Sequence, residues 1–209
     1  MCLEKIEWLN VGKMRKLEHI CVFCGSKEGN DQVIIDVATE LGYALADHDI
    51  TLVYGAAKIG IMGLVAKATL SKKGKVIGII PEFLKLKEVV HLGLTELHTT
   101  TNMHERKMLM QTKSDGFITM PGGMGTFEEL FEILTWLQLG LHSKPVGLLN
   151  VNHYYDDLLL MLEKMVKKGF LAIDNFELLI VDDQIDRLLE KMKNFRDPKK
   201  PKWLNNERT

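Results

Sequence analysis

The segment best suited to chemistry is MPGGMGTFEEL, residues 120–130. Three of its residues are glycines, which let bare backbone N–H groups approach a ligand closely. Two carboxylates, Glu128 and Glu129, follow at the start of a predicted helix. A carboxylate beside such a turn can act as an acid or base, or stabilise developing positive charge.

The same glutamates also have a purely structural interpretation. Thr126 followed by Glu129 matches a capping box, in which Thr126 is the N-cap and Glu129 bonds back to the backbone. Glu128 would then be a solvated acid of the first turn, where the helix dipole favours negative charge. Spacing alone favours this structural interpretation for both residues.

A second segment, NMHERKMLM at residues 102–110, places Arg106 and Lys107 early in another predicted helix. Cations near a helix N-terminus oppose the macrodipole, so their position is easier to explain if an anionic ligand binds there. The alternative is that both side chains are solvated, and for Lys107 taken alone we favour it.

Two further glycine-rich turns follow predicted strands, CGS at residues 24–26 and YGAAKIGIMG at residues 54–63. Taken singly, each is more often a tight turn than a ligand site. GAAKIG is not a G-x-G-x-x-G fingerprint, since position 57 is alanine, and the sequence contains no G-x-x-x-x-G-K-[ST] P-loop motif. Together the three turns offer N–H groups and helix N-termini that bind anions, and we expect that anion to be a phosphate.

Strand and helix patterns alternate along the chain, and several strands are apolar at nearly every position. This predicts an α/β fold: a Rossmann-like, doubly wound, mainly parallel sheet with helices on both faces. In such a sheet the carboxyl ends of the strands meet at one edge, so the three turns should share a site. The predicted strands are 19–25, 50–55, 75–81, 94–100, 116–121, 144–150 and 176–181 (an edge strand), and the predicted helices are 31–48, 61–74, 103–114, 126–139, 154–169 and 184–195.

The bulk composition predicts one domain, since 209 residues with 46% hydrophobic content can form one sizeable core. We expect an N-terminal extension over residues 1–17, a single Rossmann-like domain over 18–195 and a basic C-terminal tail over 196–209. The net charge of −1 gives no reason to expect nucleic acid or a membrane as a partner.

The cysteines and the N-terminal residues bear on location. Cys21 and Cys24 lie three apart on a predicted strand, where side chains point to opposite faces, so we expect buried cysteines rather than a redox or metal pair. Three cysteines in total, and no secretory signal in the first twenty residues, predict a cytoplasmic protein. We expect neither a metal nor a cofactor.

The chain resembles the LOG ("lonely guy") family, the cytokinin riboside 5′-monophosphate phosphoribohydrolases, often labelled lysine decarboxylases. PGGMGTFEE matches the family motif PGGxGTxxE, and MHERK is a second specific motif. Other segments occur in family order, namely VFCGS, LVYG, GIMG, VIGIIP, TWLQLGLHSKPVGLLN and YYDDLL. The resemblance covers about residues 18–190.

The resemblance implies a nucleotide-binding catalytic domain that hydrolyses the N-glycosidic bond of an N6-modified adenosine 5′-monophosphate. The products are the free base and ribose 5-phosphate, and a homodimer is implied. Glu129 is the implied catalytic carboxylate and Arg106 its partner. With the glycine turns, the candidate substrate-binding residues are Gly25, Ser26, Gly55, Glu88, Lys107, Gly122, Gly123, Met124, Gly125, Thr126, Phe127, Glu128 and Thr135.

One segment departs from the family pattern. Members commonly read YGGG after the second strand, where this chain has Ala56 and Ala57. Added methyl groups restrict positive φ, which leaves open the phosphate or ribose contact of this loop and the preferred substrate.

Other functions remain open. One alternative is an AMP nucleosidase acting on unmodified AMP, and another is a nucleotide- or cofactor-binding carrier without turnover. The presence of both Arg106 and Glu129 favours an enzyme. Lysine decarboxylation is disfavoured, because no lysine lies in an apolar pattern suited to anchoring pyridoxal phosphate.

Overall fold

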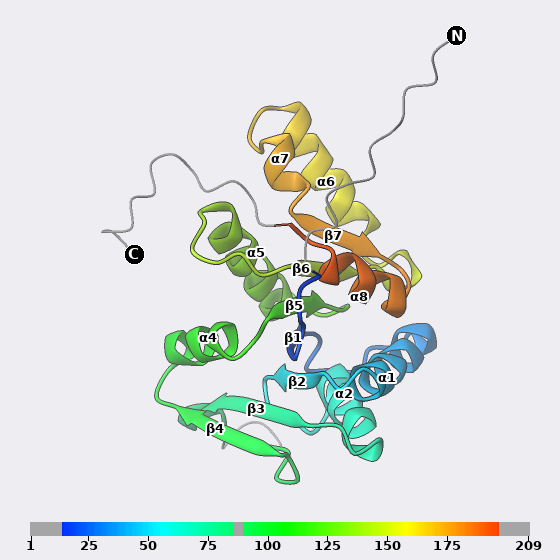
Figure 1. Ribbon diagram of the computed structural model, residues 1–209, viewed down its shortest axis with the longest axis vertical. Coiled ribbons are helices and arrows are strands. Elements are labelled where there is room, and N and C mark those ends of the chain that lie inside the picture. The colour runs from blue at the N-terminus through cyan, green and yellow to red at the C-terminus, as the bar shows by residue number, and fades with distance from the viewer. Residues whose placement is uncertain (1–13, 86–89, 197–209) are drawn as a thin grey trace.

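The computed structural model describes residues 14–85 and 90–196, and it shows one seven-stranded sheet (Figure 1). The strand order is β4-β3-β2-β1-β5-β6-β7, and every neighbouring pair is parallel. Most of the expected terminal extension and tail, and Glu88, lie outside the described residues. The strands are β1 (His19–Phe23), β2 (Thr51–Tyr54), β3 (Val76–Pro81), β4 (Glu96–Thr100), β5 (Gly116–Thr119), β6 (Val146–Leu149) and β7 (Leu179–Asp182).

Helices cover both faces of the sheet, which confirms the doubly wound α/β fold. Buried side chains of α1, α2 and α8 form one core with one face of the sheet, and those of α4, α5 and α6 form a second core with the other. The helices are α1 (Gln32–Asp47), α2 (Gly60–Ser71), α3 (Glu82–Lys85), α4 (Met103–Thr112), α5 (Met124–Gln138), η1 (Val151–His153), α6 (Asp156–Lys167), α7 (Ile173–Phe176) and α8 (Ile185–Lys193).

Strand β1 shows why the sequence folds this way. Its residues are apolar at nearly every position, as a strand covered on both faces requires. Cys21 belongs to the core on the α5 side and Cys24, just after the strand, to the core on the α1 side. The two cysteines are free and buried on opposite sides of the sheet, as predicted.

The functional edge of the sheet lies where the strand order reverses. β1 is flanked by β2 and by β5, so the chain builds one half of the sheet outward from β1 and the other outward from β5. Such a switch point opens a crevice at the carboxyl ends of the two central strands. The turns after β1 and β5 meet there, with Gly25 N–H donating to the carbonyl of Pro121 at 3.1 Å.

The remaining predictions differ from the structure in small ways. The 176–181 strand is an edge strand as expected, formed by Leu179–Asp182. The short helices α3 and α7 and the 3₁₀ turn η1 have no counterpart in the predictions, because single turns carry little periodic signal.

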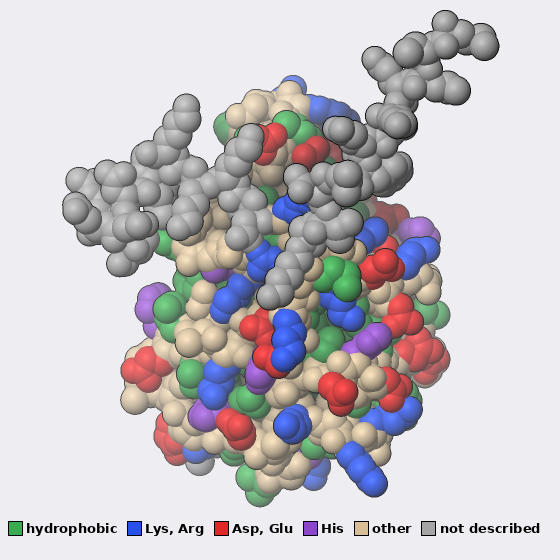
Figure 2. All heavy atoms as spheres, viewed as in Figure 1, with side chains coloured by type: hydrophobic (Ala, Val, Ile, Leu, Met, Phe, Trp, Pro, Cys, Tyr) green, Lys and Arg blue, Asp and Glu red, His purple; other side chains and the backbone are tan. Residues whose placement is uncertain are grey.

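The surface in Figure 2 mixes acidic and basic side chains, without a broad patch of one sign on that face. Among the helices of the described residues, none combines the length and apolar character needed to cross a bilayer.

Candidate active site

Two adjoining cavities lie at the switch point. The smaller, called here the carboxylate cavity, has a volume of about 250 Å³, and the larger, the loop cavity, about 580 Å³. They share Ser26 and Gly123. The carboxylate cavity is lined by Val22, Cys24, Ser26, Gly55, Met62, Met103, Arg106, Met110, Gly123, Met124, Gly125, Thr126, Glu128 and Glu129.

Arg106 is the cation of the carboxylate cavity. It is the fourth residue of α4, is only 7% exposed, and packs so closely on Gly55 that a Cβ there would collide with its Nη2. In the part of the chain that the structure describes, its Nε is buried without a hydrogen-bond partner, and its Nη1 reaches only Met103 Sδ at 3.8 Å. Within the described residues it forms no ion pair, an unusual state for a buried charge. The site therefore holds an unpaired cation suited to an anionic ligand.

Glu129 is the carboxylate most altered by this environment. Burial raises its pKa from the ordinary 4.5 to about 7, with the charge of Arg106 opposing that rise and the charge of Glu128 adding to it. A carboxyl with this pKa can exchange a proton at neutral pH, as general acid–base chemistry requires.

The capping box predicted for Thr126 and Glu129 is wrong. Helix α5 begins at Met124, with Gly123 as the N-cap and no side-chain cap. The carbonyl oxygen of Gly123 accepts the first hydrogen bonds of the helix, from the N–H groups of Thr126 (3.0 Å) and Phe127 (3.2 Å). Glu129 consequently lies in the second turn, beyond the N3 position that a capping box requires. Its place on the cavity wall is not explained by capping.

The same start of α5 leaves donors for an anion. Within the described residues, the N–H groups of Gly122, Gly123, Met124 and Gly125 make no hydrogen bond to the protein. An uncapped helix N-terminus of this kind binds anions through its N–H groups and its dipole. Thr126 and Ser26 add hydroxyl groups to the cavity wall.

Several other predicted residues also reach the cavities. Gly55, Met124, Gly125 and Glu128 line the carboxylate cavity, and Gly25 and Gly122 line the loop cavity. The remaining three described candidates, Lys107, Phe127 and Thr135, line neither of the two.

Lys107 is held between helices rather than turned to a cavity. Its Nζ lies 2.6 Å from Glu128 Oε1 and 2.8 Å from Glu132 Oε1, so it joins α4 to α5. Burial would lower the pKa of Lys107, but the bonds to the two glutamates raise it. The solvated alternative therefore does not describe this side chain, which is 15% exposed.

Phe127 and Thr135 make contacts with residues that lie outside the two cavities. The Phe127 ring meets Tyr155 edge-on at 5.7 Å, and the Thr135 hydroxyl donates to the Phe131 carbonyl at 2.7 Å. Thr135 is exposed on α5, roughly 9 Å along the helix from Glu129.

The YGAA segment keeps the backbone of a glycine turn. Ala56 has φ of +65°, in the left-handed region that costs a non-glycine residue about 1 kcal/mol. Its carbonyl accepts from His91 N–H at 3.0 Å, and Ala57 pairs with Val90. Neither alanine lines the two cavities, so the added methyl groups do not narrow them.

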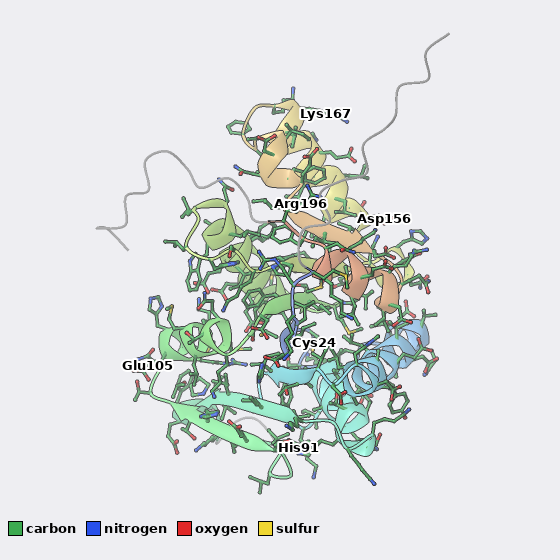
Figure 3. All side chains as sticks on the ribbon, viewed as in Figure 1. Cys24, His91, Glu105, Asp156, Lys167 and Arg196 are labelled. Carbon is green, nitrogen blue, oxygen red and sulfur yellow. The ribbon has the colours of Figure 1, made fainter. Side chains whose placement is uncertain are left out.

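Sequence reasoning missed several residues of the cavity walls. Cys24, labelled in Figure 3 at the end of β1, lines the carboxylate cavity with Met62 and Met103, and Tyr154 lines the loop cavity. The available signal was position, since Cys24 and Tyr154 each follow a strand whose carboxyl end lies at this edge. Within the described residues, no three His, Cys, Asp or Glu side chains are grouped to hold a metal ion.

Solved structures with this fold include carriers. The chain matches a molybdenum cofactor binding protein from Rippkaea orientalis with a TM-score of 0.64 and 22% identity, over 85% of this chain and 96% of that one. It matches a molybdenum cofactor carrier protein from Chlamydomonas reinhardtii with a TM-score of 0.65 and 19% identity, over 86% and 98%. At these identities the likeness shows the Rossmann-like fold alone.

Relatives found by sequence have a much higher identity to this chain than these solved structures have. The family model described as "Possible lysine decarboxylase" matches residues 62–192. A probable cytokinin riboside 5′-monophosphate phosphoribohydrolase of Oryza sativa subsp. japonica is 45% identical over 84% of this chain and 79% of that protein. A probable enzyme of the same name from Arabidopsis thaliana is 49% identical over 75% and 78%. The chain therefore belongs to the LOG family, that of the cytokinin riboside 5′-monophosphate phosphoribohydrolases.

Proposed function

We propose that this protein hydrolyses the N-glycosidic bond of an N6-modified adenosine 5′-monophosphate, releasing the free base and ribose 5-phosphate. The observation that carries the proposal is the buried guanidinium of Arg106, which forms no ion pair within residues 14–85 and 90–196, in the same cavity as a carboxyl group of raised pKa. The names of its relatives in rice and Arabidopsis give the substrate class.

In this mechanism the uncapped N-terminus of α5 holds the 5′-phosphate. The donors are the N–H groups of Gly123, Met124 and Gly125, which no other described residue bonds, and the hydroxyl groups of Ser26 and Thr126. Charge-assisted bonds of this kind contribute about 1.5–3 kcal/mol each. Adenosine should therefore be a far poorer substrate than its monophosphate.

Glu129 acts on the ribose. Positive charge develops on the ribose as the bond between its C1′ and the base nitrogen breaks. An ionised Glu129 stabilises that charge or takes a proton from the attacking water. The oxygen of water forms a bond to C1′ as the C1′–N bond breaks, and one proton of that water ends on the departing base, which gives free base and ribose 5-phosphate. Arg106 partners this carboxylate and neutralises negative charge in the cavity, which keeps part of the Glu129 population ionised near neutral pH.

We further propose that the enzyme is a homodimer through α4 and α5. Met124, Phe131 and Thr135 lie on one exposed side of α5, and Met108 is exposed on neighbouring α4. Exposed apolar side chains on adjoining helices support a partner surface. A second copy on this surface gives Thr135 a route to a substrate that it does not approach in its own chain. Analytical ultracentrifugation of Phe131→Glu should show a shift toward monomer.

We place the reaction in the cytoplasm, a proposal supported by the free, buried thiols of Cys21 and Cys24.

The test of the activity is product analysis with four variants. The wild-type protein is incubated with AMP and with N6-isopentenyl-AMP, and free base is measured by chromatography. Glu129→Gln and Arg106→Ala should each lower kcat by about 10²-fold or more while the proteins remain folded. Glu163→Gln on α6 and Tyr43→Phe on α1 are the controls, since neither residue lines the two cavities.

The result also separates the alternatives. Release of base from AMP at a rate equal to that from the N6-modified nucleotide would favour the AMP nucleosidase. Binding of both nucleotides without any base release would favour a carrier. A Glu129→Gln protein with wild-type turnover would refute the role given to this carboxylate.

A further inference from the structure

The turn between β5 and α5 has each of its carbonyl groups held by a hydrogen bond from the protein. The carbonyl of Met120 accepts from the Tyr155 hydroxyl at 2.7 Å, and that of Gly122 accepts from the Tyr154 hydroxyl at 2.7 Å. The carbonyl of Pro121 accepts from Gly25 N–H, and that of Gly123 from the first turn of α5. Two adjacent tyrosines, from the turn after β6, therefore hold this turn at two points.

These bonds fix the direction of the N–H groups that follow. In a trans peptide the carbonyl and the next N–H point in opposite directions, and the described residues contain no cis peptide. A bond to the Gly122 carbonyl therefore orients the N–H of Gly123, which makes no bond to the described protein. Glycines on both sides of that peptide would otherwise leave it free to rotate.

The backbone that carries Tyr154 is itself strained. Asn152 has φ of +46° and His153 of +61°, a conformation that side-chain-bearing residues rarely adopt. The Asn152 side chain donates to Asp31 Oδ2 at 2.8 Å, which ties this turn to the start of α1. Tyr154 then stands edge-on to Tyr155, with ring centroids 4.9 Å apart. The strain is concentrated immediately before the residue that aims at Gly122.

We propose that Tyr154 is a positioning residue for phosphate recognition, acting by holding the Gly122–Gly123 peptide so that the Gly123 N–H faces the anion. The inference rests on the proposed phosphate site and deepens it. Tyr154 bonds to the carbonyl oxygen of this peptide, which points away from the Gly123 N–H, so its effect on the anion is indirect.

Tyr155 supplies a matched comparison. Its hydroxyl makes a bond of the same length and type, but to the peptide between Met120 and Pro121. Proline has no N–H, so this bond orients no donor. If positioning of an N–H is what matters, the two tyrosines must differ in their effect on phosphate although their hydrogen bonds are alike.

The experiment measures binding of ribose 5-phosphate by calorimetry, which requires no turnover. Tyr154→Phe should weaken binding about tenfold, as expected for one poorly oriented donor. Tyr155→Phe should bind within about twofold of wild type, although its melting temperature falls because a buried carbonyl loses its partner. A Tyr154→Phe protein with wild-type affinity, or a Tyr155→Phe protein with an equal loss, would overturn the inference.

Two further outcomes keep this inference apart from the proposed activity. If the wild type binds ribose 5-phosphate with the expected difference between tyrosines but releases no base, the activity fails and the positioning role stands. If base is released but ribose 5-phosphate does not bind, the positioning role fails. Tyr154→Leu, which removes the ring of a 44% exposed side chain, serves as the second variant and should lose at least as much affinity as Tyr154→Phe.

Discussion

The N-termini of α4 and α5 border the same cavity but are built in opposite ways. Helix α4 is capped by its own side chains: Asn102 Oδ1 accepts from Glu105 N–H at 2.9 Å, and Glu105 Oε2 accepts from Thr101 N–H at 2.9 Å. Figure 3 shows Glu105 at the outer start of α4. Helix α5 begins at Met124 and has a glycine, Gly123, as its N-cap, so it has no side-chain cap.

The difference shows how the two helices divide their tasks. A capped terminus satisfies its donors within the protein, so α4 serves as a stable carrier for Arg106 and Lys107. An uncapped terminus keeps its donors and its dipole for a ligand, at some cost in stability. The carboxyl group that the family motif supplies, Glu129, then lies one turn further along α5.

The largest effect is expected from giving α5 the cap that it lacks. The Gly123→Asp substitution fits, because φ is −94° and a Cβ there meets no atom within 4 Å. Its carboxylate should cap the helix, raise the free energy of unfolding by about 0.3 kcal/mol, since glycine is itself a tolerated N-cap, and repel phosphate. We expect ribose 5-phosphate affinity to fall by about 10²-fold.

Gly123→Ala is the control for that change, since it adds a Cβ without a cap or a charge. Its affinity should stay within about threefold of wild type. A Gly123→Asp protein that binds phosphate normally would show that the α5 terminus is not the anion site.

The second prediction concerns the pH dependence of activity. With the pKa of Glu129 at about 7 and the ionised carboxylate as the active form, kcat/KM should fall about tenfold per pH unit below 7. Measurements with the N6-modified nucleotide from pH 5 to 9 would reveal this limb. A rate that instead rises on acidification would make Glu129 an acid rather than a base.

The third prediction concerns the pH dependence of the free energy of unfolding. Because the folded pKa of Glu129 is raised from 4.5 to about 7, the folded state binds the proton more tightly. The stabilisation that comes from proton binding by Glu129 is therefore complete below about pH 4.5, and it is lost as pH rises through 7. Relative to wild type, Glu129→Gln should gain on the order of 2 kcal/mol in unfolding free energy between pH 4.5 and pH 8.

Denaturant unfolding at the two pH values would measure that gain. Glu163→Gln on exposed α6 provides the control, with no comparable change. Equal differences at both pH values would show that Glu129 titrates normally in the folded protein.

The smallest effect is expected on the α4 side of the comparison. Asn102→Ala removes the cap of α4 and should cost about 1 kcal/mol of unfolding free energy. Thermal unfolding would show the loss, while ribose 5-phosphate affinity should remain close to wild type. A large loss of affinity without a loss of stability would mean that α4 also contributes its terminus to the ligand.

The sequence predicts the fold well because its signals are local and repeated. The apolar strands, their alternation with helices, and the glycine turns suffice to predict a parallel sheet with one functional edge. The register at the start of α5 could not be obtained in this way. Thr126 and Glu129 satisfy the spacing of a capping box, but Gly123 can start a helix without any side-chain signal.

The contacts that decide the site depend on tertiary packing. Lys107 meets Glu128 and Glu132 only because α4 and α5 lie side by side, and Tyr154 reaches Gly122 from 32 residues away. The unpaired state of Arg106 likewise depends on what surrounds it in three dimensions. No local pattern encodes these distances.

The buried guanidinium of Arg106 has a consequence for the stability of the protein. A ligand that binds only the folded state raises the free energy of unfolding by RT ln(1 + [L]/Kd), about 2.7 kcal/mol at a hundredfold excess over Kd. Because the Nε of Arg106 has no hydrogen-bond partner among the described residues, an anionic ligand can supply the bond that the fold leaves unmade. Bound nucleotide should therefore raise the melting temperature and the resistance of the protein to proteolysis.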